Sequence, residues 1–310
     1  MLISVVLPCY NEEAVIAETY KQLTAVMQEI NEPYELLFVN DGSKDNTLHI
    51  LRGIATTDAS VKIVSFSRNF GHENATTAGL NHCSGDVAVM MDADLQDPPR
   101  EIPGMLALMK EEKASVVYGV RKKRDGEPWL RLFGIKVFYR FLNYMSDFKF
   151  PLDSGDFRIV DRKAINQFNS LKEKNKYVRG LISWVGFKQI PYYYDREPRF
   201  AGETKMPFRV LLKFALVGIF YFSKRPLSIA TSLGLISIIL GILYAAWALI
   251  SKIMDQSYVV GGWTSTIILI IFFGGVQLLT IGILGTYIGN LFEEVKARPP
   301  YIVEEKINFE

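Results

Sequence analysis

Short apolar runs alternate with longer amphipathic stretches over residues 2–121. The apolar runs are rich in Val, Ile and Leu without clean polar alternation, which is typical of strands buried on both faces of a parallel sheet. They predict strands at Leu2–Pro8, Tyr34–Asn40, Val61–Phe66, Asp86–Asp92 and Ser115–Val120. The stretches between them predict helices at 12–30, 44–57, 72–83 and 99–112, with Asn11, Ser43 and Asn46 as candidate helix starts. This alternation predicts a doubly wound α/β domain.

Two long apolar runs dominate the C-terminal part of the chain, at Leu227–Ile250 and Thr264–Leu291. Only Lys252 and Asp255 are charged within the segment 226–292. A helix over the first run would be roughly 36 Å long, enough to cross a hydrocarbon core of ~30 Å. A buried hairpin of a soluble protein is the alternative. The length of the runs and their lack of charge favour a transmembrane hairpin.

Basic residues flank this hairpin on both sides, as they do on the cytoplasmic side of membrane spans. They are Lys205, Arg209, Lys213, Lys224 and Arg225 before the first span, and Lys296 and Arg298 after the second. The chain begins without the basic n-region and the cleavage site of a signal peptide, so none is expected. We therefore expect a multi-pass protein of the cell membrane, with both termini and the N-terminal domain in the cytoplasm.

Residues 206–225, just before the hairpin, have a different pattern. Arg209 and Lys213 lie four positions apart among apolar residues, which predicts a basic amphipathic helix at the membrane surface. A core helix of the N-terminal domain is the alternative. In the second span, Gly285 and Gly289 have a spacing that permits close contact between helices, which suggests a homo-oligomer.

Composition limits the function classes further. The chain has 35 Lys and Arg against 33 Asp and Glu, a net charge of +2 that offers no argument for nucleic-acid binding. A hydrophobic share of 49% and an aromatic share of 13% exclude a disordered chain. The two cysteines lack the paired spacing of a zinc site, and His49, His72 and His82 are too scattered to predict a catalytic or metal cluster.

The candidate chemistry follows the predicted strands, because ligands of such sheets bind beyond the carboxyl ends of the strands. Neither G-x-G-x-x-G nor G-x-x-x-x-G-K-[ST] is present, so a dinucleotide dehydrogenase and a P-loop protein lose their main support. The strands are followed instead by Pro8–Glu13, Asn40–Ser43, Ser67–Gly71, Asp92–Asp97 and Arg121–Arg124. Acidic, polar and basic groups thus converge on one edge of the sheet.

The segment Asp92-Ala93-Asp94 has a clear physical rationale. Hard divalent cations prefer oxygen ligands, which two carboxylates at a strand end and a nucleoside diphosphate can supply together. The cation then neutralises the charge that builds up on a departing diphosphate. With Asp41 and the arginines at neighbouring strand ends, this segment predicts transfer of a group from a nucleotide.

Together these motifs resemble the inverting glycosyltransferases of family 2, which have the GT-A fold. The resemblance runs through Val5–Glu12, Val39–Ser43, Arg68–Gly71 and Met91–Pro99. Within that family the chain is similar to polyprenyl-phosphate glycosyltransferases, including dolichol-phosphate mannose synthases, and most of all to bacterial bactoprenol (undecaprenyl-phosphate) glucosyltransferases with a C-terminal two-helix hairpin. The resemblance implies a Rossmann-like, mostly parallel GT-A domain at 1–205, a juxtamembrane helix at 206–225, the hairpin at 226–292 and a cytoplasmic tail at 293–310.

The resemblance also implies roles for individual residues. The residues implied for the donor nucleotide are Pro8, Tyr10, Glu12, Asp41, Asp92 and Ala93, and those implied for Mg²⁺ or Mn²⁺ are Asp94 and Gln96. The residues implied for the acceptor phosphate are Arg121, Arg131, Ser154, Arg199 and Lys205. Asp92, Asp94 and Asp156 are implied in catalysis, Asp156 either as a base or as an orienting group. Thr204 stands where the family usually has Ser, a departure that keeps the hydroxyl.

A phosphate monoester acceptor suits these side chains. At pH 7 it is mostly a dianion, so it is already a nucleophile and needs no strong base. The site must instead offset its repulsion from an anionic nucleotide sugar, which arginines can do. We therefore expect inverting transfer of a hexose to undecaprenyl phosphate in one in-line displacement. A basic face that only contacts anionic lipid is the alternative for Arg121, Arg124 and Arg131.

Several alternatives stay open for the function. UDP-glucose is the expected donor from the overall resemblance, and GDP-mannose, UDP-N-acetylglucosamine and a UDP-aminopentose also fit. A processive polysaccharide synthase would need more helices and a Q-x-x-R-W motif, which the sequence lacks. A non-catalytic, nucleotide-binding membrane scaffold is opposed by the intact Asp92, Asp94 and Gln96.

Overall fold

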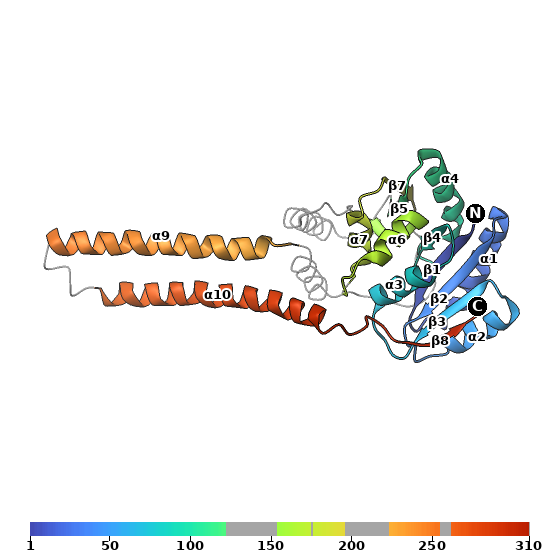
Figure 1. Cartoon of the computed structure of the whole chain (residues 1–310), viewed down its shortest axis with the longest axis horizontal. Coiled ribbons are helices and arrows are strands. Elements are labelled where there is room, and N and C mark those ends of the chain that lie inside the picture. Colours follow the sequence, from blue (N-terminus) through green and yellow to red (C-terminus); the bar gives the residue numbers. More distant parts are fainter. Residues whose placement is uncertain (122–153, 175, 196–222, 255–261, 310) are drawn as a thin grey trace. The chain divides into compact units, whose positions relative to one another are not determined.

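The computed structural model of the chain describes residues 1–121, 154–174, 176–195, 223–254 and 262–309 (Figure 1). They fall into two compact units. The first unit contains the described residues up to 195 together with 297–309, and the second contains 223–254 and 262–296. The first unit is built on a sheet, and the second on two long helices.

The sheet of the first unit has the strand order β7-β5-β6-β4-β1-β2-β3-β8. Its strands are β1 (Ile3–Cys9), β2 (Tyr34–Asn40), β3 (Val61–Phe66), β4 (Val87–Met90), β5 (Val116–Arg121), β6 (Ser154–Asp161), β7 (Gln189–Tyr194) and β8 (Val303–Ile307). β1 pairs in parallel with β2 and β4, and β2 with β3, whereas β6 runs antiparallel to β4 and β5, and β8 antiparallel to β3. The carboxyl ends of β1 to β4 therefore meet at one edge.

Helices pack on both faces of this sheet (Figure 1). One group comprises α1 (Ile16–Ile30), α2 (Thr47–Thr57) and α4 (Ile102–Glu112), which follows the 3-10 turn η1 (Pro99–Glu101). The other comprises α3 (His72–His82), α6 (Arg162–Ser170) and α7 (Val178–Trp184). Ile16, Leu23 and Met27 of α1 share one side of that helix and join the buried core that includes Val5. Gly79 of α3 lies instead against Val6, the next residue of β1, which faces the other way.

The sequence-based expectation of a mostly parallel α/β sheet is confirmed. Each of the five expected strands is present, with bounds shifted by at most two residues. The helix expected over 12–30 begins only at Ile16, and Asn11 before it takes a left-handed backbone conformation with φ 56°. Strands β6, β7 and β8 were not expected. β6 and β8 carry charged residues between their apolar ones, which makes their hydrophobic pattern weak.

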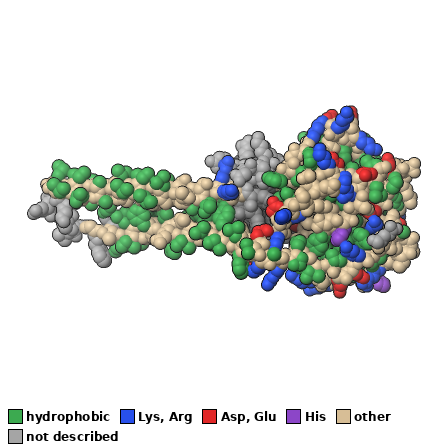
Figure 2. All heavy atoms as spheres, viewed as in Figure 1, with side chains coloured by type: hydrophobic (Ala, Val, Ile, Leu, Met, Phe, Trp, Pro, Cys, Tyr) green, Lys and Arg blue, Asp and Glu red, His purple; other side chains and the backbone are tan. Residues whose placement is uncertain are grey.

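The second unit consists of α9 (Arg225–Met254) and α10 (Trp263–Val295). They pack against each other, with Gly241 of α9 facing the ring of Phe273 on α10, and the Tyr287 hydroxyl donates a hydrogen bond to the Ser223 carbonyl. Apolar side chains line both helices and are almost all exposed (Figure 2). By length and composition both helices could cross a membrane. Their exposure does not fit the alternative of a hairpin buried in a soluble protein.

Some expectations concern residues outside the described part of the chain. They are the amphipathic helix over 206–222 and the side chains of Arg124, Arg131, Arg199, Lys205, Arg209 and Lys213. For Ser154, the structure describes the backbone position at the start of β6.

Candidate active site

Two loops at the carboxyl edge, after β1 and after β2, are held together by hydrogen bonds. The Asn11 N–H donates to Ser43 Oγ over 3.0 Å, and the Lys44 N–H donates back to Asn11 Oδ1 over 2.8 Å. The Glu12 N–H donates to Thr47 Oγ1 over 2.8 Å. Asn11 thus joins the two loops and does not start a helix, which corrects the expectation from its sequence position.

The residues expected to bind the donor nucleotide lie along this edge. Pro8 is buried within β1, and Tyr10 directly after β1 is 39% exposed, so its ring is open to a stacking partner. Glu12 is half-buried beside it in the same loop. Asp41 follows β2, and Ala93 lies in the loop after β4. The structure therefore brings all of these positions to the ends of neighbouring strands.

Asp41 organises the loop after β3, which we call the donor loop (residues 67–71). Its carboxylate is 3% exposed and accepts the N–H groups of Phe70 over 2.6 Å and Gly71 over 2.9 Å. Gly42 approaches this loop so closely that a Cβ atom would lie 2.4 Å from the Arg68 carbonyl carbon, and its φ is +64°. Burial raises the pKa of Asp41, and the two backbone hydrogen bonds offset part of that rise.

The loop after β4 carries Asp92, Ala93, Asp94 and Gln96, and it is anchored from α1. The buried Thr19 hydroxyl donates to the Ala93 carbonyl over 2.7 Å, between the two aspartates. The Gln96 N–H donates to Asp94 Oδ1 over 3.1 Å, and Asp94 is 8% exposed. These contacts fix the backbone from which the carboxylates project.

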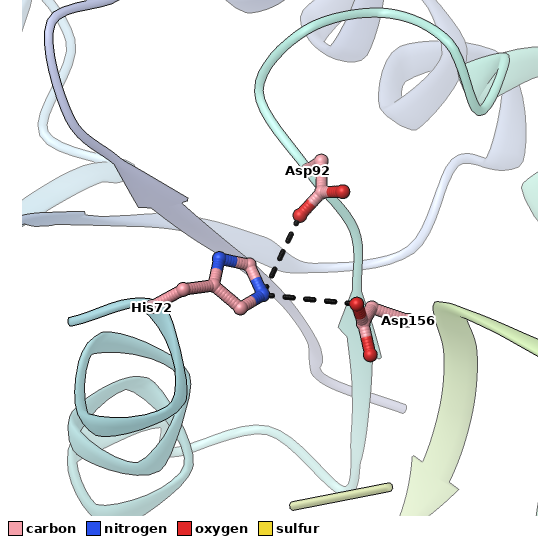
Figure 3. Close-up of side chains that lie close together, drawn as sticks. All are labelled: His72, Asp92 and Asp156. Atoms are coloured by element: carbon pink, nitrogen blue, oxygen red, sulfur yellow. Dashed lines mark ion pairs between the residues drawn. The ribbon is translucent and has the colours of Figure 1, made fainter. Parts of the chain in front are cut away.

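Asp92, Asp156 and His72 form a cluster at this edge (Figure 3). His72 Nε2 lies 3.7 Å from Asp92 Oδ1 and 3.8 Å from Asp156 Oδ2. Burial raises the pKa of Asp92 to about 6, Asp156 and Asp94 add to the rise, and His72 opposes it. The expectation that the histidines would join no such cluster is therefore wrong for His72. It starts α3, and the fold brings that helix start beside the end of β4 and the start of the antiparallel strand β6, where Asp156 lies.

Arginines from β6 and α7 surround Asp156. Arg179 of α7 donates to Asp156 Oδ1 over 2.8 Å. Burial would raise the pKa of Asp156, but Arg179 and His72 bring it below its ordinary value. Arg158 is only 1% exposed, and burial together with Arg179 lowers its pKa to about 10. On the same side, Glu73 accepts the Val178 N–H over 2.8 Å, and burial and Asp156 raise its pKa.

Sequence reasoning missed four residues of this region. They are His72, Glu73, Arg158 and Arg179. His72 and Glu73 directly follow the Arg68–Gly71 motif, so a motif extended by two residues would have included them. Arg158 lies within the segment Asp153–Arg158 around Asp156. Arg179 had no sequence signal, because only the packing of α7 brings it to Asp156.

Arg121 is the one expected acceptor residue whose side chain the structure describes. It ends β5, and its guanidinium group lies close to Gly155, next to Asp156 in β6. Its Nε atom is buried and has no hydrogen-bond partner among the described residues. Arg121 also lowers the pKa of the neighbouring Tyr194 hydroxyl, which burial and Asp97 raise.

Comparison with known proteins decides the family of this chain. The model of Glycosyl transferase family 2 matches residues 4–168, which span the first strands, the aspartates after β4 and Asp156. The chain belongs to glycosyltransferase family 2. It is therefore a glycosyltransferase, and the arrangement of strands and site loops described above is the GT-A-like fold expected from its motifs.

Relatives cover nearly the whole chain. An uncharacterized glycosyltransferase of Bacillus subtilis, YkcC, is 48% identical over 99% of this chain and 94% of its own length. The prophage-derived bactoprenol glucosyl transferase of Shigella flexneri is 39% identical over 98% of both chains. Among solved structures, mannosyl-3-phosphoglycerate synthase from Rubrobacter xylanophilus matches with a TM-score of 0.50 at 18% identity, over 71% of this chain and 72% of that one, which is a likeness of fold.

Proposed function

We propose that this glycosyltransferase moves a hexose, glucose from UDP-glucose, onto undecaprenyl phosphate with inversion at the anomeric carbon. The observation that carries the proposal is the set of carboxylates after β4 and at the start of β6, with Arg121 next to it. The bactoprenol glucosyl transferases, 38–39% identical over nearly the full chain, support the choice of sugar and acceptor.

The donor half of the site comprises the edge from β1 to β4. We infer that Tyr10 stacks on the base, while Pro8, Glu12 and Asp41 shape the pocket for base and ribose. Asp92 and Ala93 then lie where the nucleotide continues toward its diphosphate. This assignment is supported by the strand ends themselves, which carry these residues side by side in the order β4-β1-β2.

The residues after β4 fit a divalent cation. Carboxylate and amide oxygens such as those of Asp94 and Gln96 are the ligands that Mg²⁺ and Mn²⁺ prefer, and the Thr19 contact holds the backbone of this loop in place. A bound cation would neutralise the charge on the leaving diphosphate. Asp94 and Gln96 would hold it, and the nearby Asp92 carboxylate, whose pKa is raised, gains from any positive charge brought to the site.

The acceptor half of the site suits a phosphate monoester. The buried Nε of Arg121 has no hydrogen-bond partner among the described residues, and a phosphate oxygen can accept from it. We infer that Arg131, Ser154, Arg199 and Lys205 complete this site. The acceptor phosphate attacks the anomeric carbon as a dianion, so no general base has to remove a proton from it. Asp156, held ionised by Arg179, therefore orients the sugar.

The two apolar helices fit a polyprenyl acceptor. Each buried CH₂ of such a chain gains ~0.8 kcal/mol, so the acceptor stays in the bilayer and the enzyme must work at its surface. We infer a GT-A domain at 1–205, an interface helix at 206–225, spans near 227–250 and 264–291, and a cytoplasmic C-terminal segment at 293–310, whose strand β8 joins the sheet of the domain. Both ends would lie in the cytoplasm, and the hairpin would allow oligomers.

The test uses membranes that contain the protein, undecaprenyl phosphate, Mg²⁺ or Mn²⁺, and a panel of labelled nucleotide sugars. Label extracted into organic solvent is expected from UDP-glucose and lost in Asp94→Asn. Glu111→Gln, an exposed carboxylate on α4, is the matched control and keeps full transfer. Label from GDP-mannose, UDP-N-acetylglucosamine or a UDP-aminopentose alone would replace the donor assignment. Transfer from no donor, with nucleotide binding intact, would favour a non-catalytic scaffold.

A second test addresses the hairpin. Residues 226–296 are replaced by a short flexible linker, so that 297–310 and strand β8 remain on the sheet. Donor binding should persist, and transfer to the long-chain acceptor should be lost. Undiminished transfer to undecaprenyl phosphate would contradict the role proposed for the hairpin.

A further inference from the structure

The segment 297–309 follows α10 directly, yet it belongs to the sheet unit. It adds β8 to the edge of the sheet beside β3. Arg52 of α2 forms an ion pair with Glu305, and Asn308 Nδ2 donates to the Val61 carbonyl over 2.8 Å. The segment is therefore held along its length by the domain that carries the site.

The start of this segment contacts the donor loop and both elements that bound it. The Ser67 N–H donates to the Ile302 carbonyl over 3.1 Å. The Tyr301 ring stacks on Phe66 at the end of β3, with ring centroids 4.9 Å apart and an angle of 12° between the rings. The Tyr301 hydroxyl accepts a hydrogen bond from Asn81 Nδ2 of α3 over 2.9 Å. Tyr301 thus contacts both the end of β3 and the last turn of α3.

The contact continues from Tyr301 into the site. The buried Phe66 ring meets Phe70 of the donor loop edge-on, with centroids 5.8 Å apart. The Phe70 N–H is one of the two that Asp41 accepts, and the loop ends where His72 begins α3 and reaches Asp92. Because interiors are close-packed, a shift of the Phe66 ring is passed on to its neighbours.

We propose that Tyr301 is a positioning residue for the nucleotide sugar, acting through Phe66 and the donor loop. This inference rests on the proposed function, because it concerns the donor half of that site. The chain leaves the domain for the hairpin and then returns with a residue that completes the support of the donor loop. Loss of the Tyr301 ring should let the loop move and weaken donor binding, with little effect on the chemical step.

The experiment uses the full chain in detergent micelles and compares Tyr301→Ala, Tyr301→Phe and Phe309→Ala. Phe309 is the matched control, because it packs in the same segment but near Lys62 at the start of β3, away from the donor loop. Binding of UDP-glucose with Mn²⁺ is measured by calorimetry, transfer by kinetics, and the Phe70 and Gly71 amides by hydrogen exchange. Thermal midpoints report folding of each variant.

Tyr301→Ala should raise the Kd and KM for UDP-glucose about tenfold, leave kcat within about twofold, and speed amide exchange in the donor loop. Tyr301→Phe, which keeps the stacked ring, should restore donor binding to nearly the wild-type value, and Phe309→Ala should leave it unchanged. Equal donor binding in Tyr301→Ala and wild type would overturn the inference, as would equal losses in Tyr301→Ala and Phe309→Ala. The wild type could bind no nucleotide while Tyr301→Ala still speeds amide exchange in the loop. That result would contradict the proposed function, and with it the role of Tyr301 in positioning the nucleotide sugar.

Discussion

The two ends of the parallel strands differ in how the surrounding groups shift the pKa of buried carboxylates. At the amino end, Glu35 is 3% exposed and accepts hydrogen bonds from Ser4 and Ser84, with Lys62 Nζ 2.8 Å away. Burial would raise the pKa of Glu35, but these partners lower it. At the carboxyl end, burial raises the pKa of Asp41, and it raises that of Asp92 to about 6.

This difference indicates that the two sets of charges have different roles. At the amino end, this chain supplies the donors for its own carboxylate, so the cluster stabilises the fold. At the carboxyl end, Asp94 and Asp156 add to the raised pKa of Asp92, and His72 offsets only part of that rise, whereas Arg179 and His72 hold the pKa of Asp156 below its ordinary value. Carboxylates held at such a cost are typical of sites completed by a cation or a ligand. Substitutions at the two ends should therefore separate activity from stability.

The largest expected effect is that of Asp156→Asn. Transfer should fall about 10²-fold at saturating donor, because the group proposed to orient the reacting sugar loses its charge. The free energy of unfolding should fall by about 1 kcal/mol, because relief of the repulsion on Asp92 and Glu73 offsets part of the lost ion pair with Arg179. Label transfer and urea unfolding in micelles measure both quantities. A large loss of stability with normal transfer per folded molecule would make Asp156 a structural residue.

Glu35→Gln should instead lower stability without affecting transfer. The amide offers one acceptor oxygen where the carboxylate accepts from Ser4, Ser84 and Lys62, so buried donors lose partners at a cost of about 2 kcal/mol in unfolding free energy. Transfer per folded molecule should not change. Glu29→Gln, an exposed residue of α1, serves as the control for a change without buried partners. A loss of transfer in folded Glu35→Gln would contradict the contrast between the amino and carboxyl ends of the strands.

The sequence predicts which residues meet at the carboxyl ends of β1, β2 and β4, for a physical reason. Each motif directly follows an apolar strand, and parallel strands place their carboxyl ends together, so a one-dimensional pattern fixes the neighbourhood of Asp41, Asp92 and Asp94. The hydrogen bonds that hold these loops, such as that from Thr19 to Ala93, join residues far apart in the sequence and have no such pattern. The sequence-based roles of the individual side chains stay predictions.

The part of the site built from later elements was less predictable. Arg179 reaches Asp156 from α7, a short helix with no motif, and Tyr301 reaches Phe66 from beyond the apolar hairpin. β8 reads Val303-Glu-Glu-Lys-Ile307, whose charges suit an edge strand but also a solvated tail. Long-range packing decided these cases, and no local sequence signal carries that information.

A smaller effect on transfer is expected from His72→Ala. His72 lies within 3.8 Å of both Asp92 and Asp156, so its loss removes a polar partner that limits their repulsion. Transfer should fall about tenfold, and His72→Lys should recover part of it, because the lysine places a positive charge near Asp92 and Asp156. His82→Ala, at the other end of α3, is the control and should keep full transfer. Equal transfer rates in the two alanine variants would show that His72 does not contribute to transfer.

The smallest expected effect is a difference in the pH dependence of stability. The pKa of Glu35 is lowered by its partners, so its contribution is present above its unfolded value of 4.5 and is lost as the pH falls through the lower folded value. The pKa of Glu73 is raised by burial and by Asp156, so ionising it costs stability, and that cost disappears as the pH falls from the raised folded value toward 4.5. Glu35→Gln should therefore reduce the loss of stability that the wild type shows as the pH falls below 4.5. Glu73→Gln should reduce the gain of stability that the wild type shows as the pH falls toward 4.5. Urea unfolding across this range measures both slopes, and slopes of the same sign for the two residues would contradict the contrast between the two ends of the sheet.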